Sequence, residues 1–316
     1  MHPFKTYTKT FCFCSLVTML LVLTITPCRA TSELLLPTFV PTENDTTVHA
    51  GQFDNGIRYY VKHNDQRPDK GTYSKRFITT ADKQRAVVIV GNIVPDEVIQ
   101  IWNGMSDEEI QVLETRQERY DKLIKQGTLQ HTWDLKYGLP PISRQNRMTS
   151  EVLYNEMMLT LIGDMLNVRL LKIHEGIAEC PFREANFTFA SEMTGLDKEA
   201  LMLKIKPTKG HDTEALQFVK DKIDFMRYTP FSPMELDNAL QQFLTAHQRI
   251  YDHRQDMTDL GYIWRISNAV TLGNTISSIE AEWHIFQSLA SQVTLEQCNA
   301  FMTILLDHCE EKHHDI

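Results

Sequence analysis

The sequence lacks the features that mark several specialised classes of protein. Its 316 residues contain no long run of lysine and arginine, and the formal net charge is −9 at pH 7. A dedicated nucleic-acid binder needs a basic surface to neutralise phosphates, so no nucleic-acid partner is expected. Low-complexity tails, collagen-like repeats and coiled-coil rods are also missing. The apolar fraction of 42% and charged fraction of 23% are typical of a globular protein of one large or two modest domains.

Motifs for covalent catalysis and phosphate binding are missing as well. No serine lies in a G-x-S-x-G setting, and Gly91-Asn92 is a lone strand end without a glycine-rich phosphate loop. Three of the six cysteines lie in the first thirty residues, and the others are Cys180, Cys298 and Cys309. None forms a C-x-x-C motif, so neither a disulfide framework nor a zinc knuckle is predicted, and pairing among the three stays open. Cys180 has no basic neighbour in sequence, which favours a structural role over a nucleophilic one.

The first thirty residues have the pattern of a secretory signal peptide. Two lysines precede an apolar stretch from Phe11 to Ile25, and small Ala30 marks the expected cleavage site. The apolar stretch is shorter than the ~20 residues that cross a bilayer. A lipid anchor on Cys28 is the weaker alternative, because a proline precedes that cysteine. We therefore expect a periplasmic or secreted protein of net charge −12, with no membrane contact once the signal is removed.

The part from residue 31 to 130 is predicted to contain strands followed by helices. Asp54-Asn55-Gly56 is a tight-turn signal before the β-prone residues 57–61, which together predict a hairpin. Residues 85–93 form the most hydrophobic run after the signal and predict a buried central strand. Helices are predicted to begin at Pro95 and, with a capping box, at Ser106, the second ending at Gly127.

The part from residue 131 to 316 is predicted to be built around residues 148–206. An amphipathic helix, capped by Thr149 or Ser150, precedes two alternating strands at 185–190 and 201–206. Another strand is predicted at 131–139, and further helices at 213–228, from Ser232, and at 263–272, 278–291 and 294–309. This order predicts an α+β fold, with a mixed or antiparallel sheet layered with helices, better than a doubly wound parallel sheet.

Two groups of titratable side chains are weak candidates for chemistry. In residues 308–314, helical spacing would bring Cys309 and His313 together as metal ligands, but a frayed, solvated C-terminus is favoured. His247 lies with Tyr251 and Asp252 on the helix that starts after Ser232. That stripe is polar, so a solvent-facing surface is favoured over a proton relay.

Several segments resemble the insulinase/pitrilysin-like metallopeptidases, in particular their bacterial exported zinc-protease branch. Phe53–Val61 is similar to that family's opening strand, L-x-N-G-L-R, and Leu166-Asn-Val-Arg-Leu170 to its L-N-x-R-L helix. Residues 73–93 are similar to a family stretch in which a tyrosine-rich helix end precedes a V-V-x-V-G strand. The strand pair and the helix start at Phe231 keep the family's order. The resemblance implies a half-domain of the insulinase and mitochondrial-processing-peptidase type.

The sequence departs from that family at the zinc site. Family members carry H-x-x-E-H on a helix, where two histidines bind zinc and the glutamate activates water. None of the twelve histidines belongs to such a motif or to H-E-x-x-H. Only residues 62–85 separate two strands that a catalytic helix normally divides, so that helix is deleted. We therefore expect no zinc, no other cofactor and no catalytic residue in this chain.

The resemblance also implies residues for peptide contact. Relatives close their second half over the substrate, with polar and aromatic side chains that hold the peptide backbone. Arg144, Arg147, Tyr154 and Arg169 are the candidates here. The favoured alternative places Tyr154 in the core and pairs Arg169 with a carboxylate nearby in sequence, such as Asp164 or Glu175.

The combined interpretation is an exported, non-catalytic or truncated relative of zinc metallopeptidases. Residues 1–30 are the signal, 31–130 the remnant of a truncated first half-domain, and 131–316 a second-half-type α+β domain. The expected partner is a full-length peptidase relative or a peptide, and the chain is expected to be inactive alone. The alternative is an exported α+β scaffold or binding domain that shares only its fold with peptidases.

Overall fold

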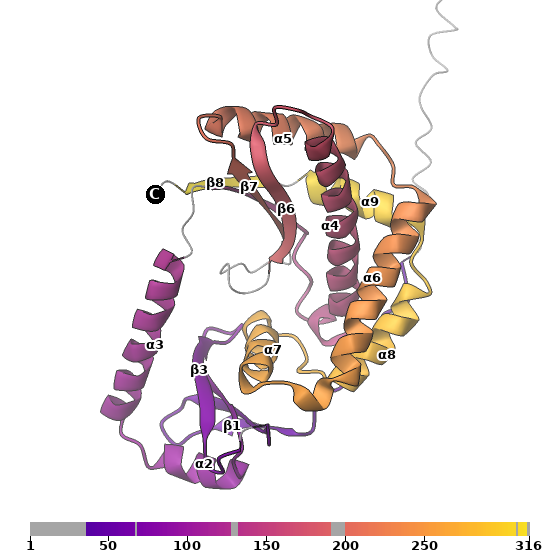
Figure 1. The fold of residues 1–316 in the computed structure, drawn as a ribbon. Coiled ribbons are helices and arrows are strands. Elements are labelled where there is room, and N and C mark those ends of the chain that lie inside the picture. Colours follow the sequence, from indigo (N-terminus) through magenta and orange to yellow (C-terminus); the bar gives the residue numbers. More distant parts are fainter. Residues whose placement is uncertain (1–35, 67, 128–131, 191–199, 308, 315–316) are drawn as a thin grey trace, which may run out of the picture. The chain divides into compact units, whose positions relative to one another are not determined.

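The computed structural model describes residues 36–316 except 67, 128–131, 191–199, 308 and 315–316. The predicted signal peptide, including Ala30, lies outside the described residues. Two four-stranded sheets and the helices that cover them make up the described chain (Figure 1). The predicted α+β fold class is therefore confirmed. None of the described helices is both long enough and apolar enough to cross a membrane.

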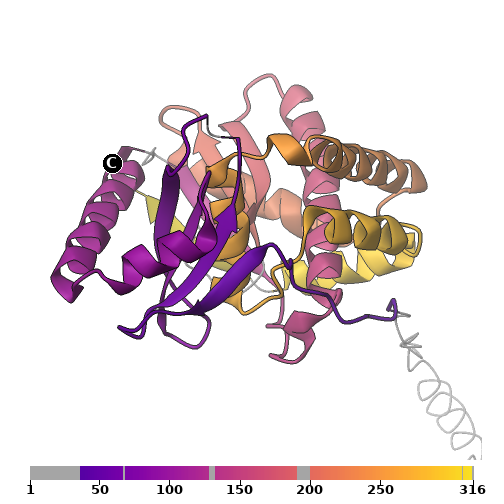
Figure 2. The same ribbon diagram turned by 90° about the horizontal axis from the view of Figure 1, so that it is seen from below.

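The first sheet contains the predicted hairpin and the predicted central strand. Its strands are β1 (Val48–Gln52), β2 (Arg58–His63), β3 (Tyr73–Thr79) and β4 (Arg85–Gly91), in the order β1-β2-β4-β3. β2 and β4 are parallel, and the other pairs are antiparallel (Figure 2). Four consecutive residues of β4, from Val87 to Val90, are fully buried. A continuous apolar run is stable there because both faces of the sheet are covered.

Different parts of the chain cover those two faces. On one face lie α2 (Pro95–Asn103) and α3 (Asp107–Gly127), which bury Trp102 and Ile110 against the sheet. On the other lies α7 (Asp259–Leu272), whose Ile263, Ile266 and Val270 pack on Val88 and Val90. A helix from the C-terminal part of the sequence thus completes the core of the N-terminal sheet.

Residues 73–79 form a strand, which corrects the expectation of a helix end taken from the resemblance. β3 pairs with β4 over its whole length, from Tyr73 opposite Gly91 to Thr79 opposite Arg85. At its outer edge the Gln117 side chain accepts a hydrogen bond from the Phe77 amide at 2.7 Å and donates to the Phe77 carbonyl at 2.8 Å. Both outward-facing backbone groups of Phe77 on this edge strand are therefore hydrogen-bonded.

The second sheet is entirely antiparallel, in the order β6-β7-β5-β8. Its strands β5 (Thr132–Gly138), β6 (Phe182–Ala190) and β7 (Ala200–Pro207) occupy the predicted regions. The predicted long helix is α4 (Glu151–Glu175), which packs against β6 and β7. Ser150 is its N-cap residue, but the Ser150 hydroxyl accepts from the Val40 amide and does not cap the helix. The Thr149 hydroxyl instead accepts from the Glu151 amide.

The C-terminal segment is a strand, contrary to the expected helix and frayed end. α9 (Leu295–Leu306) stops before residue 309, and β8 (Cys309–His314) pairs with β5. In a strand, residues i and i+4 lie about 13 Å apart, so the helical i, i+4 spacing expected for positions 309 and 313 is not formed. No group of three His, Cys, Asp or Glu side chains in the described part of the chain is arranged to hold a metal ion.

The remaining helices pack on one another and on the second sheet. α5 (Asp212–Arg227) covers β7, while α6 (Pro233–Asp252) packs on α4 and on α8 (Ile279–Ala290). Capping boxes are formed at the starts of α6 and α9, by Ser232 with Glu235 and by Thr294 with Gln297. These caps fix where both helices begin.

Candidate functional site

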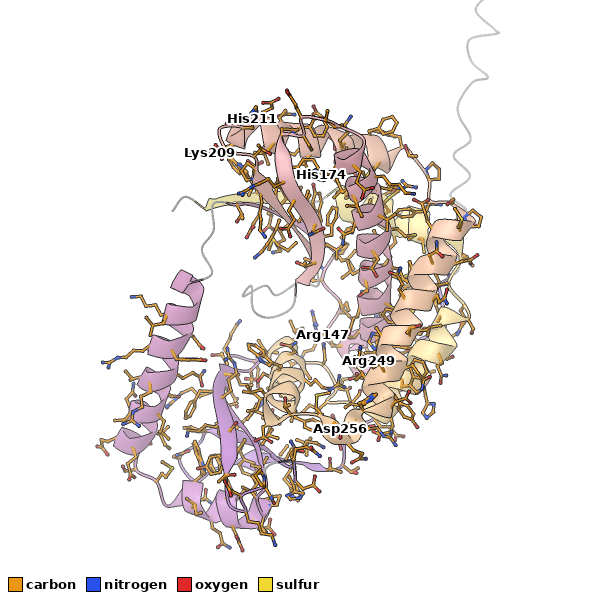
Figure 3. The ribbon with its side chains drawn as sticks, in the orientation of Figure 1. Arg147, His174, Lys209, His211, Arg249 and Asp256 are labelled. Atoms are coloured by element: carbon orange, nitrogen blue, oxygen red, sulfur yellow. The ribbon has the colours of Figure 1, made fainter. Side chains whose placement is uncertain are left out.

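A pocket of about 880 Å³ lies where five separate segments of the chain meet. Its lining comes from residues 42–50, from β2 at Arg58 and Tyr60, from the β3–β4 turn at 80–83, from 142–148, and from 270–276 at the C-terminal end of α7. Figure 3 shows Arg147, one of the lining residues, beside α7. Four of the lining side chains are cationic: Arg58, Lys83, Arg144 and Arg147.

Backbone hydrogen bonds hold these segments in place. The turn between β3 and β4 closes through the Thr80 amide on the Gln84 carbonyl at 2.9 Å. The amide of Ala81, the residue after Thr80, donates to the Val270 carbonyl in the last turn of α7 at 3.2 Å. α7 stops at Gly273, whose φ of 77° suits glycine. The pocket walls are thus built on the ends of regular elements.

Two of the four predicted contact residues, Arg144 and Arg147, lie in this pocket. Arg144 precedes the short 3-10 helix η1 (Asn146–Met148), which follows β5, and Arg147 lies within it. The Arg147 Nη1 donates to the Asn274 side-chain oxygen at 3.0 Å, which joins this segment to the end of α7. Arg144 is exposed. Arg58 and Lys83 were not predicted, because neither has a sequence signal that sets it apart from a surface cation.

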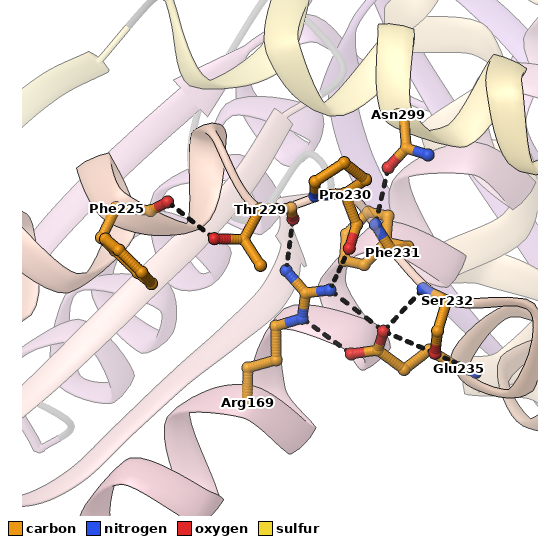
Figure 4. Close-up of polar contacts among 8 residues, drawn as sticks. All are labelled: Arg169, Phe225, Thr229, Pro230, Phe231, Ser232, Glu235 and Asn299. Atoms are coloured by element: carbon orange, nitrogen blue, oxygen red, sulfur yellow. Dashed lines mark hydrogen bonds and ion pairs between the residues drawn. The ribbon is translucent and has the colours of Figure 1, made fainter.

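Arg169 lies elsewhere, in a closed set of contacts on α4 (Figure 4). Its Nε and Nη2 donate to the Glu235 carboxylate at 2.7 and 3.0 Å, and its Nη1 and Nη2 to the carbonyls of Thr229 and Pro230 at 2.7 and 2.8 Å. The partner is Glu235, not Asp164 or Glu175. The hydrogen bonds from Arg169, with those from Ser232, lower the pKa of Glu235 to about 2. Arg169 thus holds the segment 229–235, in which α6 begins, against α4.

Tyr154 is a core residue and does not reach the pocket. It is 1% exposed and packs against the rings of Phe39 and Phe301. Burial raises the pKa of its hydroxyl to about 12, and that hydroxyl has no hydrogen-bond partner among the described residues.

His247 is packed between aromatic rings, which corrects the expected solvent-facing position. Its ring centroid lies 4.2 Å from that of Phe243 and 4.4 Å from that of Phe286. Burial, together with the nearby Arg265 charge, lowers the pKa of His247 to about 4. A histidine that stays neutral in an aromatic setting acts here as a packing residue.

The three cysteines in the described part of the chain, Cys180, Cys298 and Cys309, are free thiols. Cys298 is buried in the core, and burial raises the pKa of its thiol to about 12, which makes it a poor nucleophile. Cys180 lines a second pocket of about 420 Å³ with His174 and Arg183. No hydrogen bond joins the Cys180 thiol to either of these side chains among the described residues.

Comparison with known sequences finds no counterpart for this chain: no protein-family model and no curated protein matches it. Comparison with solved structures, in contrast, finds proteins of similar fold. The first half of the periplasmic protease PqqL from Escherichia coli matches with a TM-score of 0.55 and 10% identity, over 87% of this chain and 94% of that one. The predicted insulinase family protease from Yersinia pestis matches with a TM-score of 0.51 and 10% identity, over 71% of this chain and 50% of that one.

The whole PqqL protease gives a TM-score of 0.54 at 10% identity, over 87% of this chain but only 48% of its own length. The chain therefore spans about half of the full-length protease. At these identities the likeness concerns the fold, and the resemblance indicated by the motifs is confirmed at that level. The chain has the fold of an insulinase-type zinc-protease half, as represented by the first half of PqqL.

Proposed function

We propose that this chain is an exported, non-catalytic relative of insulinase-type peptidases that binds a peptide or a partner protein. One observation carries the proposal. The chain follows the fold of the first half of PqqL over 94% of that half, yet its sequence contains no H-x-x-E-H motif. The proposal is that the chain uses the fold of such proteases for binding and lacks the zinc motif needed to cleave what it binds.

The residues at the expected zinc position do not fit the metal. Between β2 and β3 the chain has only residues 64–72, which form turns in their described part and no helix. The Asn64 side chain there donates to the Asp259 carboxylate at 2.7 Å and to the Met257 carbonyl at 3.1 Å. An amide held in this way supports the loop and offers no imidazole pair to zinc. No catalytic step through zinc is therefore assigned to this chain.

The same comparison supports a partner of defined kind. The chain matches 48% of full-length PqqL, which supports a partner that resembles the other half of such a protease. We propose a full-length peptidase relative, or a peptide bound without one. The signal-like first thirty residues and the periplasmic relatives support export to the periplasm or the medium.

Metal analysis and a peptidase assay test the proposal together. The purified mature chain, starting at Thr31, should contain no stoichiometric zinc, and incubation with an unstructured peptide mixture should give no cleavage that a chelator suppresses. Affinity purification from the periplasmic fraction should recover a peptidase relative or peptides. Stoichiometric zinc with chelator-sensitive cleavage would overturn the non-catalytic assignment.

The alternative, a scaffold unrelated in function to peptidases, predicts a different outcome. Such a protein would recover neither peptides nor a peptidase relative under conditions in which an intact, folded chain is recovered. Mass spectrometry of the exported protein would show in addition whether its first residue is Thr31.

A further inference from the structure

The cations in the 880 Å³ pocket are unusual for a protein of net charge −9. Four cationic side chains line it, and the acidic side chains in the lining are Asp45 and Asp82. Because acidic residues outnumber basic residues by 41 to 32 in the sequence, an excess of positive charge in a pocket needs a separate explanation. An excess of one sign in a concave site raises the local concentration of ligands of the opposite sign.

Both carboxylates of the lining are already engaged. Asp45 forms an ion pair at 2.9 Å with Lys62, a largely buried side chain that does not line the pocket. Asp82 forms an ion pair at 3.1 Å with Arg58. Lys83 has no ion pair with any described residue. Arg144 has none within 4 Å, although the Thr80 hydrogen bond, the Arg58 charge and the Arg144 charge together lower the pKa of Asp82. The pocket therefore keeps positive charge after its own acids are taken into account.

Lys83 stands out for its backbone as well as its charge. Its φ is 65°. Of the described residues other than glycine, Lys83 is the one with a positive φ. This left-handed position in the β3–β4 turn suits glycine or asparagine, because a Cβ there is crowded. A lysine that occupies it at a cost in stability is expected where its side chain serves a purpose.

The rest of the lining suits a ligand with both polar and apolar parts. Among the polar lining side chains, the Thr42 hydroxyl donates a hydrogen bond to the Thr275 hydroxyl at 2.8 Å. Apolar side chains lie beside them, among them Met148, which is 62% exposed. The volume of the pocket falls in the usual range of small-ligand sites, roughly 300–1,000 Å³.

We propose that this pocket binds a short acidic peptide segment, with ligand carboxylates on Lys83 and Arg144 and an apolar ligand residue beside Met148. Arg147 is held by Asn274 on the same wall and adds to the field. Guanidinium groups favour carboxylates because they donate two parallel hydrogen bonds. The inference rests on the proposed peptide-binding function and specifies the ligand class and the place of binding.

Titration of the mature chain with labelled peptides tests the inference. One peptide alternates glutamate with leucine, and a matched peptide carries glutamine at every glutamate position. By fluorescence anisotropy, the acidic peptide should bind at least about tenfold more tightly than the neutral one. Raising the salt from 50 to 300 mM should remove most of that difference, because exposed charges are screened within about 10 Å.

Two variants locate the site. Lys83→Gly removes the charge but leaves a residue that accepts the left-handed turn, so weaker binding cannot be attributed to a damaged fold. Arg144→Glu reverses the charge of an exposed side chain. Each should weaken binding of the acidic peptide about fivefold or more. The control is Lys209→Glu, an exposed lysine outside the pocket lining, labelled in Figure 3, which should bind as the unaltered chain does.

The outcomes separate this inference from the proposed function. Equal binding of the acidic and neutral peptides, or equal losses in Lys83→Gly and Lys209→Glu, overturns the acidic pocket while peptide binding itself stands. Binding of neither peptide overturns the pocket, and recovery of partners in the affinity purification then decides the proposed function separately. A competition experiment compares inorganic phosphate with unlabelled glutamate-leucine peptide, each at 10 mM. If phosphate displaces the labelled acidic peptide equally well, the site binds small anions and the inference of an acidic-peptide site is overturned.

Discussion

The surroundings of α6 and the cationic pocket use the same residue types in opposite ways. At α6, Arg169 gives its hydrogen bonds to Glu235 and two carbonyls, and its side chain is 13% exposed. In the pocket, Arg144 is exposed and has no ion pair among the described residues. The donors of Arg169 are used in hydrogen bonds within the fold, whereas the guanidinium of Arg144 is exposed to solvent.

The difference shows that charge in a sequence does not by itself indicate a binding residue. A charge that is enclosed and hydrogen-bonded stabilises the structure, and its removal leaves partners buried without compensation. A charge at the rim of a hollow contributes little to stability and is available to a ligand. Four measurements, in order of decreasing expected effect, would sharpen this comparison or break it.

Arg169→Ala should give the largest loss of stability. It leaves two carbonyls without the donor that Arg169 supplies and leaves the Glu235 carboxylate with only its Ser232 donors, so we expect a loss of about 3 kcal/mol in the free energy of unfolding. Arg144→Ala should change it by less than about 0.5 kcal/mol. Urea denaturation of both variants at pH 7 provides the measurement. Losses of similar size would show that the two arginines do not differ in role.

His247 should make the α6 region sensitive to mild acid. Its pKa of about 4 in the folded protein lies below the ordinary value of 6.5, so the unfolded chain takes up a proton first as the pH falls. Stability from the neutral ring is complete above pH 6.5 and is lost as the pH falls toward 4, by about 2 kcal/mol. His247→Leu should remove this part of the pH dependence in urea titrations at pH 7 and 4.5. An unchanged slope in the variant would place the titrating group elsewhere.

Glu235 should make the same region sensitive to stronger acid. Arg169 and Ser232 lower its pKa from 4.5 to about 2, so its contribution is complete above pH 4.5 and is lost as the pH falls toward 2. Because the side chain is partly solvated, we expect about 1 kcal/mol over that window. Glu235→Gln keeps the shape of the cap and should be less stable at pH 7. Its loss between pH 4.5 and 2.5 should be smaller than that of the unaltered chain.

Lys83→Gly should slightly stabilise the protein. Glycine accepts a φ of 65° without the crowding of a Cβ, although it also adds freedom to the unfolded chain. We expect a net gain of about 0.5 kcal/mol in thermal or urea unfolding. Glycine at the nearby exposed position Gln84, where no left-handed backbone is required, should be neutral or destabilising. A loss at Lys83 as large as at Gln84 would argue against strain in the turn.

Much of the fold could be predicted because local patterns and tertiary contacts agree. The Asp54-Asn55-Gly56 turn, the apolar run of β4 and the capping boxes of α6 and α9 each depend on neighbours within a few residues. The strand β8 could not be predicted in this way. Its charged residues 309–314 have no alternating pattern, and pairing with β5, more than 170 residues earlier, is what makes them a strand.

The candidate site was predictable only in part. Arg144 and Arg147 were singled out from the sequence, but nothing local joins them to Arg58 and Lys83, which come from the other sheet. The H-x-x-E-H motif differs, because its absence can be read directly from the sequence as a missing pattern of fixed spacing.

The sequence by itself determined the α+β class, most element boundaries and the lack of an H-x-x-E-H motif, because helix caps, strand alternation and metal-ligand spacing are local. Tertiary structure alone decided that Arg169 pairs with Glu235, that His247 lies between two aromatic rings, and that α7 covers one face of the first sheet. It also decided that Lys83 and Arg144 share a pocket. These outcomes depend on contacts between residues far apart in the chain, which no short-range pattern encodes.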